Sequence, residues 1–378
     1  MKKVGRQVLF LETNENNLRN GEGSFVRLSD GRIMYAYTQF LGKSREDHAT
    51  AQIVAIYSSD EGETWTEPTV LFDKGPNSLN VMGASILKLA NGEIGIKYGR
   101  KDMTASGYIV AMPKYRYSKD DGKTWSEEIA CAEEPGYYCG TNNRLVQLKN
   151  GRLLYPYSYL GGEKDRTFTA GVFKLFYSDD NGRTWGILDT EVRSPFNDNI
   201  GLQEPGILEL DDGRIWMYCR TEYGHQYQSF SSDGGMTWTT PAPNFLFTSP
   251  NSPMLATKVK DYVIAIYNPL GYSPVNDRVW HSETANGRPI RTPFICAFSR
   301  DGGKSFDTTN KTFRPSFVNE CVYLEDDLNN GYCYPAVIEV EGGFLVAYYH
   351  SNGSDVNCLN CTKMIKISWE EVENAIKF

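Results

Sequence analysis

One eight-residue pattern recurs five times in this chain and constrains its fold more than any other feature. The pattern Ser-x-Asp-x-Gly-x-Thr-Trp starts at Ser58, Ser118, Ser178 and Ser231, and a degenerate copy that ends in Ser-Phe starts at Ser299. The starts are separated by 60, 60, 53 and 68 residues. A unit that recurs at such a period is one supersecondary element, which buries its apolar face against its neighbours. In a strand-rich sequence this period predicts a β-propeller.

The residue types in the pattern indicate a structural turn. An Asp side chain can accept hydrogen bonds from backbone N–H groups just downstream, and Gly adopts a positive φ without strain. The Thr hydroxyl can tie the turn together, and the Trp ring can pack between neighbouring sheets. We therefore expect the five Asp residues to be architectural, with no catalytic or metal-binding role.

A second repeat consists of two short apolar runs joined by a tight turn, which is the signal of a β-hairpin. Six hairpins over 378 residues allow about 63 residues for each four-stranded blade. We predict an all-β fold: a single domain over 1–378 that forms a six-bladed β-propeller of four-stranded antiparallel blades, one of which lacks a good copy of the repeated turn. Residues 4–11 are predicted to form a strand that closes the ring against the last blade, and 368–378 a short helix. The six turns are Asp30-Gly31, Asn91-Gly92, Asn150-Gly151, Asp212-Gly213, Lys260-Asp261 and Gly342-Gly343.

Charge and composition exclude several classes of function. The net charge is −8 without long charged blocks, which gives a nucleic-acid partner little support. No apolar run is long enough for a membrane span. The N-terminus has no apolar signal-peptide core, which favours a cytoplasmic protein or one whose leader has been trimmed. Oligomeric state does not follow from the sequence.

The eight cysteines are too sparse for a disulfide framework in a chain of this length. Cys358 and Cys361 form a lone C-x-x-C with His350 nearby. A structural zinc site needs four ligands, so we expect free thiols, no metal and no cofactor.

The hairpins also sort candidate site residues by the end of the sheet at which they lie. Two antiparallel strands joined by a tight turn bring the start of the first beside the end of the second. Glu204 therefore lies beside Arg220 in the fourth hairpin, and Tyr334 beside His350 in the sixth. The same end of the fold is expected to collect Arg100 after the second hairpin, Arg45, Asp47 and His48 in the loop after the first, and Arg291 before the last copy of the repeated turn.

The repeated turn and this end of the fold together resemble the sialidase superfamily, in which the turn is called the Asp box. In that family a Glu, an apolar stretch that ends in E-L-x-D-G and a strand that ends in Arg follow one another, as do Glu204, 209–213 and Arg220 here. The resemblance implies that Tyr334 is the nucleophile and Glu204 its base. It also implies that Arg220 and Arg291 bind a substrate carboxylate. A neutral tyrosine suits this reaction because an anionic nucleophile would be repelled by that carboxylate.

The chain departs from the family in its first blade. The family's first arginine lies in an F-R-I-P or Y-R-I-P segment, whereas residues 19–25 contain no such motif. Thr38 stands where the family has its acid/base Asp, so Asp47, with His48 beside it, is the best substitute. The third arginine is left open among Arg45, Arg100 and Arg144.

The leading hypothesis is a sialidase-like exo-glycoside hydrolase that removes a terminal acidic sugar with retention through Tyr334. Its partner would be a glycan or small acidic-sugar substrate, bound by Arg220, Arg291, Arg100, Arg45, His48 and His350, with Asp47 as acid/base. One alternative is a propeller hydrolase or lyase that acts on another acidic sugar such as a uronate. The other is a non-catalytic carbohydrate-binding propeller.

Overall fold

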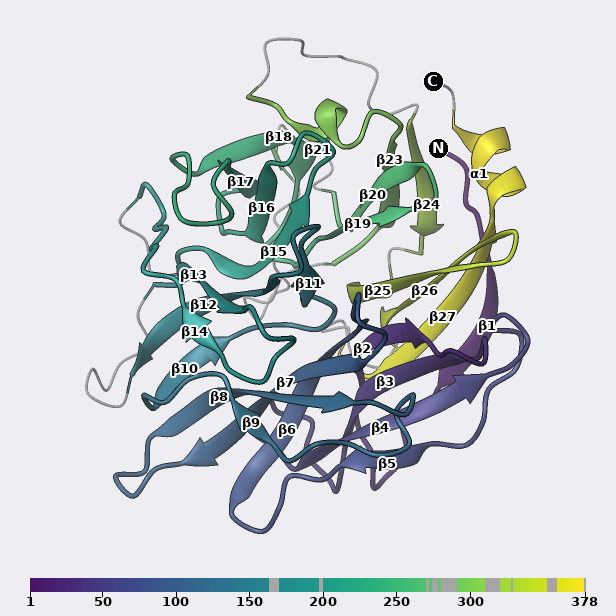
Figure 1. Cartoon of the computed structure of the whole chain (residues 1–378). Helices are drawn as coiled ribbons and strands as arrows, with labels where there is room; N and C mark the ends of the chain where they lie inside the picture. Colours follow the sequence, from purple (N-terminus) through teal and green to yellow (C-terminus); the bar gives the residue numbers. More distant parts are fainter. Residues whose placement is uncertain are drawn as a thin grey trace.

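The computed structural model describes residues 1–162, 170–196, 200–269, 272–273, 278–279, 291–309, 320–327, 329–351 and 359–376. The fold is all-β, as predicted, with a single short α-helix in the described residues. Figure 1 shows the sheets packed side by side, and their strands pair antiparallel except where β8 and β10 meet. Within the described residues, no helix has the length and apolar character needed to cross a membrane.

Four of the sheets have four strands each. In each of them, neighbouring strands are hydrogen-bonded in the following order. The first sheet is β2 (Asn20–Arg27), β3 (Ile33–Phe40), β4 (Ala51–Ser58) and β5 (Thr69–Phe72). The fourth is β15 (Gln203–Glu209), β16 (Ile215–Arg220), β17 (His225–Ser231) and β18 (Ala242–Thr248). The fifth is β19 (Leu255–Val259), β20 (Tyr262–Tyr267), β23 (Phe294–Ser299) and β24 (Cys321–Glu325). The last is β25 (Tyr332–Val340), β26 (Gly343–His350), β27 (Cys361–Ser368) and β1 (Arg6–Leu11).

The second and third units are joined into one nine-stranded sheet, which the sequence did not predict. The linking strand is β10 (Gly136–Cys139), which pairs in parallel with β8 at Tyr137 and Ala111 and antiparallel with β12. On its two sides lie β6 (Ser78–Lys88), β7 (Ile94–Met103), β8 (Ile109–Ser118) and β9 (Ile129–Ala130), and β11 (Val146–Gln147), β12 (Leu153–Gly162), β13 (Val172–Ser178) and β14 (Gly186–Ile187). A further pair is β21 (Tyr272–Ser273) and β22 (Arg278–Val279). All six predicted hairpins are present.

The repeated turns have the hydrogen bonds that their residue types predict. In the first, Ser58 Oγ donates to Asp60 at 2.8 Å, and the backbone N–H and hydroxyl of Thr64 donate to the same carboxylate at 2.9 and 2.6 Å. Hydrogen bonds from Thr64 lower the pKa of Asp60 to about 2. The turns at Asp120, Asp180, Asp233 and Asp301 keep the Ser-to-Asp bond and the backbone bond to the carboxylate.

Four of the five turns pack against the sheet that precedes them in the chain, and the first turn packs against the last sheet. The glycine at the centre of the turn approaches so closely that a Cβ on Gly62 would lie 2.5 Å from the side chain of Leu345 in the last sheet. The corresponding contacts of the other turns are Gly122 with Met34, Gly182 with Tyr115, Gly235 with Leu175 and Gly303 with Leu210. The glycine is therefore required for its positive φ of 85° at Gly62 and also for space.

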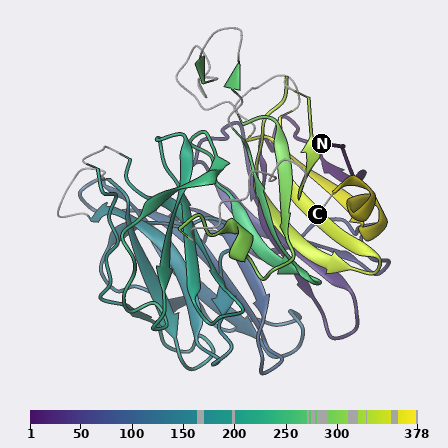
Figure 2. The ribbon, with the colours of Figure 1, turned by 90° about the horizontal axis from the view of Figure 1, so that it is seen from above.

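The two ends of the chain are held beside each other, as Figures 1 and 2 show. β1 pairs antiparallel with β27, which confirms the predicted strand over residues 4–11. The predicted C-terminal helix is α1 (Trp369–Ala375), which begins with a capping box between Ser368 and Glu371. Its Trp369 ring stacks on Tyr262 of the fifth sheet at a centroid distance of 5.6 Å.

Candidate active site

A β-bulge at the same place in several sheets turns side chains toward a common cavity. The register shifts between Gly21 and Ser24 in β2, between Gln203 and Gly206 in β15, and between Cys333 and Ala336 in β25. The residue inside each shift has a positive φ: 52° at Glu22, 45° at Glu204 and 55° at Tyr334. Positive φ is strained in a residue with a side chain, and such strain clusters at functional sites. All three residues line one cavity of about 80 Å³.

Tyr334 and Glu204 form a direct hydrogen bond in this cavity. The Tyr334 hydroxyl donates to Glu204 Oε1 at 2.6 Å, although the two residues are 130 positions apart in the chain. Arg220 Nη1 lies 2.8 Å from Glu204 Oε2 and 3.4 Å from the Tyr334 hydroxyl. Burial and the nearby Glu204 carboxylate raise the pKa of Tyr334, whereas the two neighbouring arginines act in the opposite direction. The phenol is therefore protonated at rest, with a carboxylate in position to accept its proton.

Arg291 lies close to the Tyr334 ring. Its guanidinium carbon is 5.6 Å from the centroid of the Tyr334 ring, and its Nη1 lies 3.2 Å from Cys333 Sγ. Nη2 donates to the backbone carbonyl of Asn251 at 3.4 Å. The structure thus brings together Glu204, Tyr334, Arg220 and Arg291, the four residues that the sequence selected by resemblance.

Arg19 is a site residue that the sequence analysis missed. Its side chain is only 2% exposed. Nη1 donates to Asp47 at 2.6 Å, Nη2 to Glu22 at 2.5 Å, and Nε to the Tyr349 hydroxyl at 2.8 Å. Arg19 directly precedes β2 of the first sheet, in the region where the family motif is absent, so no motif marked it. Arg144, one of the three candidates for the third carboxylate-binding arginine, donates to the Met254 carbonyl at 2.5 Å.

A sequence signal could have found this part of the site. Glu22 stands nine positions before Gly31 of its hairpin turn, and Glu204 stands nine positions before Gly213. Two carboxylates at the same offset from equivalent turns occupy equivalent places in a repeated fold. The offset therefore identifies Glu22 as a partner of the cavity, and Arg19 lies three residues ahead of it.

Asp47 and Glu22 bind the same arginine but have opposite pKa shifts. Burial raises the pKa of Glu22 above its usual value, because this outweighs the attraction of Arg19. Burial also acts to raise the pKa of Asp47, but the positive charges of Arg19 and Lys101 dominate and lower it. The Asp47 side chain remains 61% exposed. Its loop is held in place because Lys101 Nζ donates to the Asp47 backbone carbonyl at 2.7 Å.

Arg100 does not have its predicted place in the site. It forms ion pairs with Asp102 at 3.0 Å and with Glu128. The side chains of β7 alternate between its two faces, and it is the neighbouring Lys101 that lines the cavity. A prediction that is wrong by one position along a strand selects the opposite face.

The other predicted substrate-binding residues lie at the margin of the site or outside it. The His48 Nε2 atom is 3.3 Å from the hydroxyl of Tyr137, which lines the cavity. Arg45 reaches the cluster through its backbone carbonyl, which accepts from Arg19 at 3.1 Å. The His350 ring packs edge-on against Tyr332 at a centroid distance of 5.2 Å, and burial lowers its pKa.

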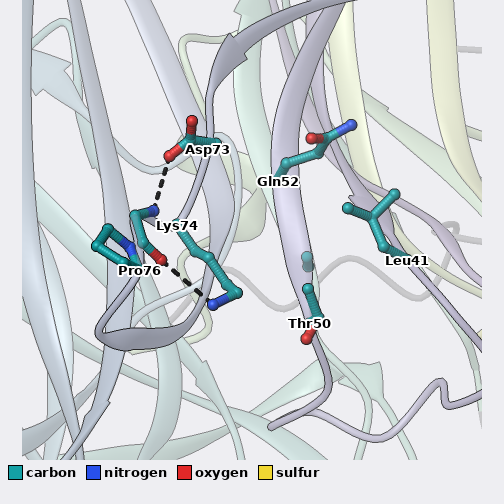
Figure 3. A pocket seen from close by; sticks show the side chains of 8 residues that line it. Leu41, Thr50, Gln52, Asp73, Lys74 and Pro76 are labelled. Atoms are coloured by element: carbon teal, nitrogen blue, oxygen red, sulfur yellow. Dashed lines mark hydrogen bonds between the residues drawn. The ribbon is translucent and has the colours of Figure 1, made fainter.

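A wider pocket is lined in part by Leu41 and Thr50, at the two ends of the loop that contains Asp47. It has a volume of about 320 Å³ and is open to solvent. Figure 3 shows Leu41, Thr50 and Gln52 on one side of it and Asp73, Lys74 and Pro76 on the other. None of the residues around Tyr334 lines it, so its size does not make it the reaction site.

Among the described residues, no three His, Cys, Asp or Glu side chains come together as metal ligands. The seven cysteines in the described ranges are free. Cys358, the first cysteine of the C-x-x-C, lies outside those ranges.

Comparisons with known proteins agree with this fold. A sialidase from Paraclostridium sordellii is 25% identical over 338 residues, which cover 82% of this chain and 72% of the relative. A protein of unknown function from Dyadobacter fermentans superposes with a TM-score of 0.70 at 18% identity, over 96% of this chain and 99% of its own. A Trypanosoma rangeli sialidase in complex with sialic acid superposes with a TM-score of 0.68 at 14% identity, over 99% of this chain and 61% of its own.

Fold and sequence together define a protein of the sialidase superfamily with a β-propeller-type fold. A family model described as "BNR repeat-like domain" matches residues 104–347, and the chain belongs to that family.

Proposed function

We propose that this protein is a sialidase-like exo-glycoside hydrolase that removes a terminal acidic sugar with retention of configuration. The observation that carries the proposal is the hydrogen bond of 2.6 Å between Tyr334 and Glu204, with Arg220 beside both. A phenol has an ordinary pKa near 10, so it needs a base to attack at neutral pH, and a carboxylate at hydrogen-bond distance can act as that base.

In the first step, the Tyr334 oxygen attacks the anomeric carbon while its proton passes to Glu204. The glycosidic bond breaks, and the leaving oxygen takes a proton from an acid. The covalent glycosyl-tyrosine is then cleaved by water, which restores Tyr334 and retains the configuration. Arg220 and Arg291 would bind the substrate carboxylate, because planar guanidinium groups match a carboxylate with two parallel hydrogen bonds.

Asp47 is the proposed acid, and Arg19 controls its protonation. Arg19 Nη1 lies 2.6 Å from Asp47 Oδ1, and its positive charge favours the ionised carboxylate. A substrate carboxylate would compete for Arg19, and the bound sugar would cover the exposed Asp47 side chain. Both changes raise the pKa of Asp47, so substrate binding itself prepares the acid.

The proposed architecture is a closed ring of six four-stranded blades. Four of the repeated turns pack on the preceding sheet, and the turn at Gly62 in the first sheet contacts Leu345 in the last. The pairing of β1 with β27 places the first strand of the chain in the last sheet. A crystal structure with another number of blades would contradict this part of the proposal.

A second candidate function uses the same site but acts on a different sugar. Lys97 and Lys101 line the cavity together with Glu22, and the sequence resemblance accounts for none of the three. These residues favour a hydrolase or lyase of another acidic sugar, such as a uronate. A product with a new ultraviolet-absorbing double bond would identify a lyase.

The decisive test is hydrolysis of a 4-methylumbelliferyl sialoside, with a panel of aryl uronides assayed in parallel. Release of the fluorophore from the sialoside, abolished in Tyr334→Phe, supports the proposal. Release of the aryl group from a uronide alone would contradict the sialidase-like activity and support the second candidate function. Specific binding of these sugars without turnover of any of them would identify a non-catalytic carbohydrate-binding propeller.

A further inference from the structure

Lys97 is a buried cation for which the proposed mechanism has no use. It lies in β7 on the same face as Lys101 and is 2% exposed. Its ammonium stands 3.7 Å from the centroid of the Tyr155 ring. Within the described residues it has no hydrogen-bond acceptor and no acidic partner, yet it lines the same cavity as Glu204 and Tyr334.

We propose that Lys97 is a second anion-binding position of this cavity, and that the ligand of the site has an anionic group in addition to the carboxylate bound by the arginines. This inference rests on the proposed function. It narrows the substrate to an acidic sugar that bears a second oxyanion, such as a sulfate ester or another carboxylate.

The pairing of charges around the cavity supports a second anion. Each carboxylate of the lining already has an arginine: Glu22 and Asp47 bind Arg19, and Glu204 binds Arg220. Lys101 is satisfied in part by the Asp47 backbone carbonyl at 2.7 Å. Lys97 is left with an aromatic face, which is a weaker partner for a buried ammonium than an oxyanion.

The cavity has room for such a group beside Lys97. Gly99 stands between Lys97 and Lys101 on the same face of β7, and a Cβ at that position would meet only the Met82 carbonyl, at 3.7 Å. The missing side chain leaves space between the two lysine stems. The cavity of about 80 Å³ is several times the roughly 10–15 Å³ that a single water molecule needs by the same measure.

The protonation behaviour of Lys97 agrees with this assignment. Burial lowers its pKa to about 7, and the groups that act in the opposite direction are the thiols of Cys131 and Cys139. An entering anion would favour the charged ammonium and raise this pKa. The position should therefore bind anions more strongly in mild acid than in mild base, whereas arginine sites keep their charge over that range.

Selenate, an analogue of sulfate that anomalous diffraction can locate, provides the test. Crystals of the wild-type protein soaked in selenate at about pH 6 are expected to show one selenium between Arg220 and Arg291 and a second beside Lys97 Nζ. At about pH 9 the second should lose most of its occupancy and the first should keep it.

Two variants make the test specific. Lys97→Met keeps the length of the stem and removes the charge, and it should abolish only the second selenium. The control is Lys114→Met, because Lys114 is similarly buried but has an acidic partner, Glu128, at 3.4 Å. It should leave both positions occupied.

Two results would overturn the inference. One is a wild-type crystal at about pH 6 with no selenium at Lys97. The other is a second selenium that persists in Lys97→Met, which would make it an adventitious ion only. If Lys97→Met does not fold, the pH series of the wild type decides. Selenate at Lys97 but absent from the arginines would contradict the proposed function and leave this inference standing.

Discussion

The first and fourth sheets place their site residues with the same backbone device but differ in what they deliver. In both, a bulge nine residues before the hairpin turn presents a glutamate at positive φ, Glu22 in one and Glu204 in the other. Glu204 has one arginine and accepts the Tyr334 hydrogen bond. Glu22 shares Arg19 with Asp47. The repeated scaffold therefore sets where a side chain points, and the residue at the bulge sets the chemistry.

The largest expected effect on activity comes from Tyr334, whose proton Glu204 of the fourth sheet would accept. Tyr334→Phe removes the nucleophilic oxygen and should lower kcat/KM by roughly 10⁴-fold with little change in Tm. Steady-state kinetics on the aryl glycoside that the protein accepts would measure this. The control is Tyr332→Phe, since Tyr332 is also buried but donates to the Asp327 carbonyl outside the site. Similar losses in both variants would mean that the tyrosines act through packing.

The next effect concerns the arginine of the fourth sheet. Arg220→Ala should lower kcat/KM by about 30-fold or more, because a lost charged hydrogen bond of this kind costs about 2–5 kcal/mol. On an analogue whose carboxylate is replaced by a neutral amide, the loss should be much smaller. Arg214→Ala is the control, since Arg214 pairs with Asp212 at the far end of the same strand. Equal losses on both substrates would show that Arg220 is structural.

A substitution of Arg19, beside the first sheet, should change the pH dependence of the activity as well as its rate. Arg19 keeps the pKa of Asp47 below its usual value, so Arg19→Met should raise that pKa. An acid with a higher pKa stays protonated to higher pH, and the alkaline limb of the kcat/KM profile should therefore move upward, with a loss of about tenfold at the optimum. If kcat/KM falls while the alkaline limb of its pH profile stays at the same pH, Asp47 is not the acid.

The smallest expected effect is on stability, through the glycines of the turns in the first sheet. Gly62 and Gly31 have similar positive φ values, 85° and 90°, but only Gly62 packs against another sheet. Gly62→Ala should lower the free energy of unfolding by about 2–3 kcal/mol, and Gly31→Ala by about 1 kcal/mol. Urea unfolding of both variants tests whether the contact between the first and last sheets matters beyond backbone strain. Equal losses would show that it does not.

Much of this protein followed from local sequence. The hydrogen bonds of the turns at Ser58 and Ser118 involve residues at most four positions apart, so the pattern alone predicts them. The hairpins and the capping box before Trp369 are local in the same way. The resemblance also selected Tyr334 and Glu204, because the order of motifs along this chain resembles that of the family, even though the contact spans 130 positions.

The remaining features depend on contacts between residues far apart in the chain. Arg19, Lys97 and Lys101 were missed because no local motif marks them. Their roles depend on groups that distant strands or loops supply: Tyr349 for Arg19, Tyr155 for Lys97 and the Asp47 backbone for Lys101. Arg100 was misplaced because a shift of one residue reverses the face of a strand. The sequence determined the repeated backbone, since its hydrogen bonds are short-range, whereas the charge arrangement of the cavity depended on which long-range neighbours the packing brought together.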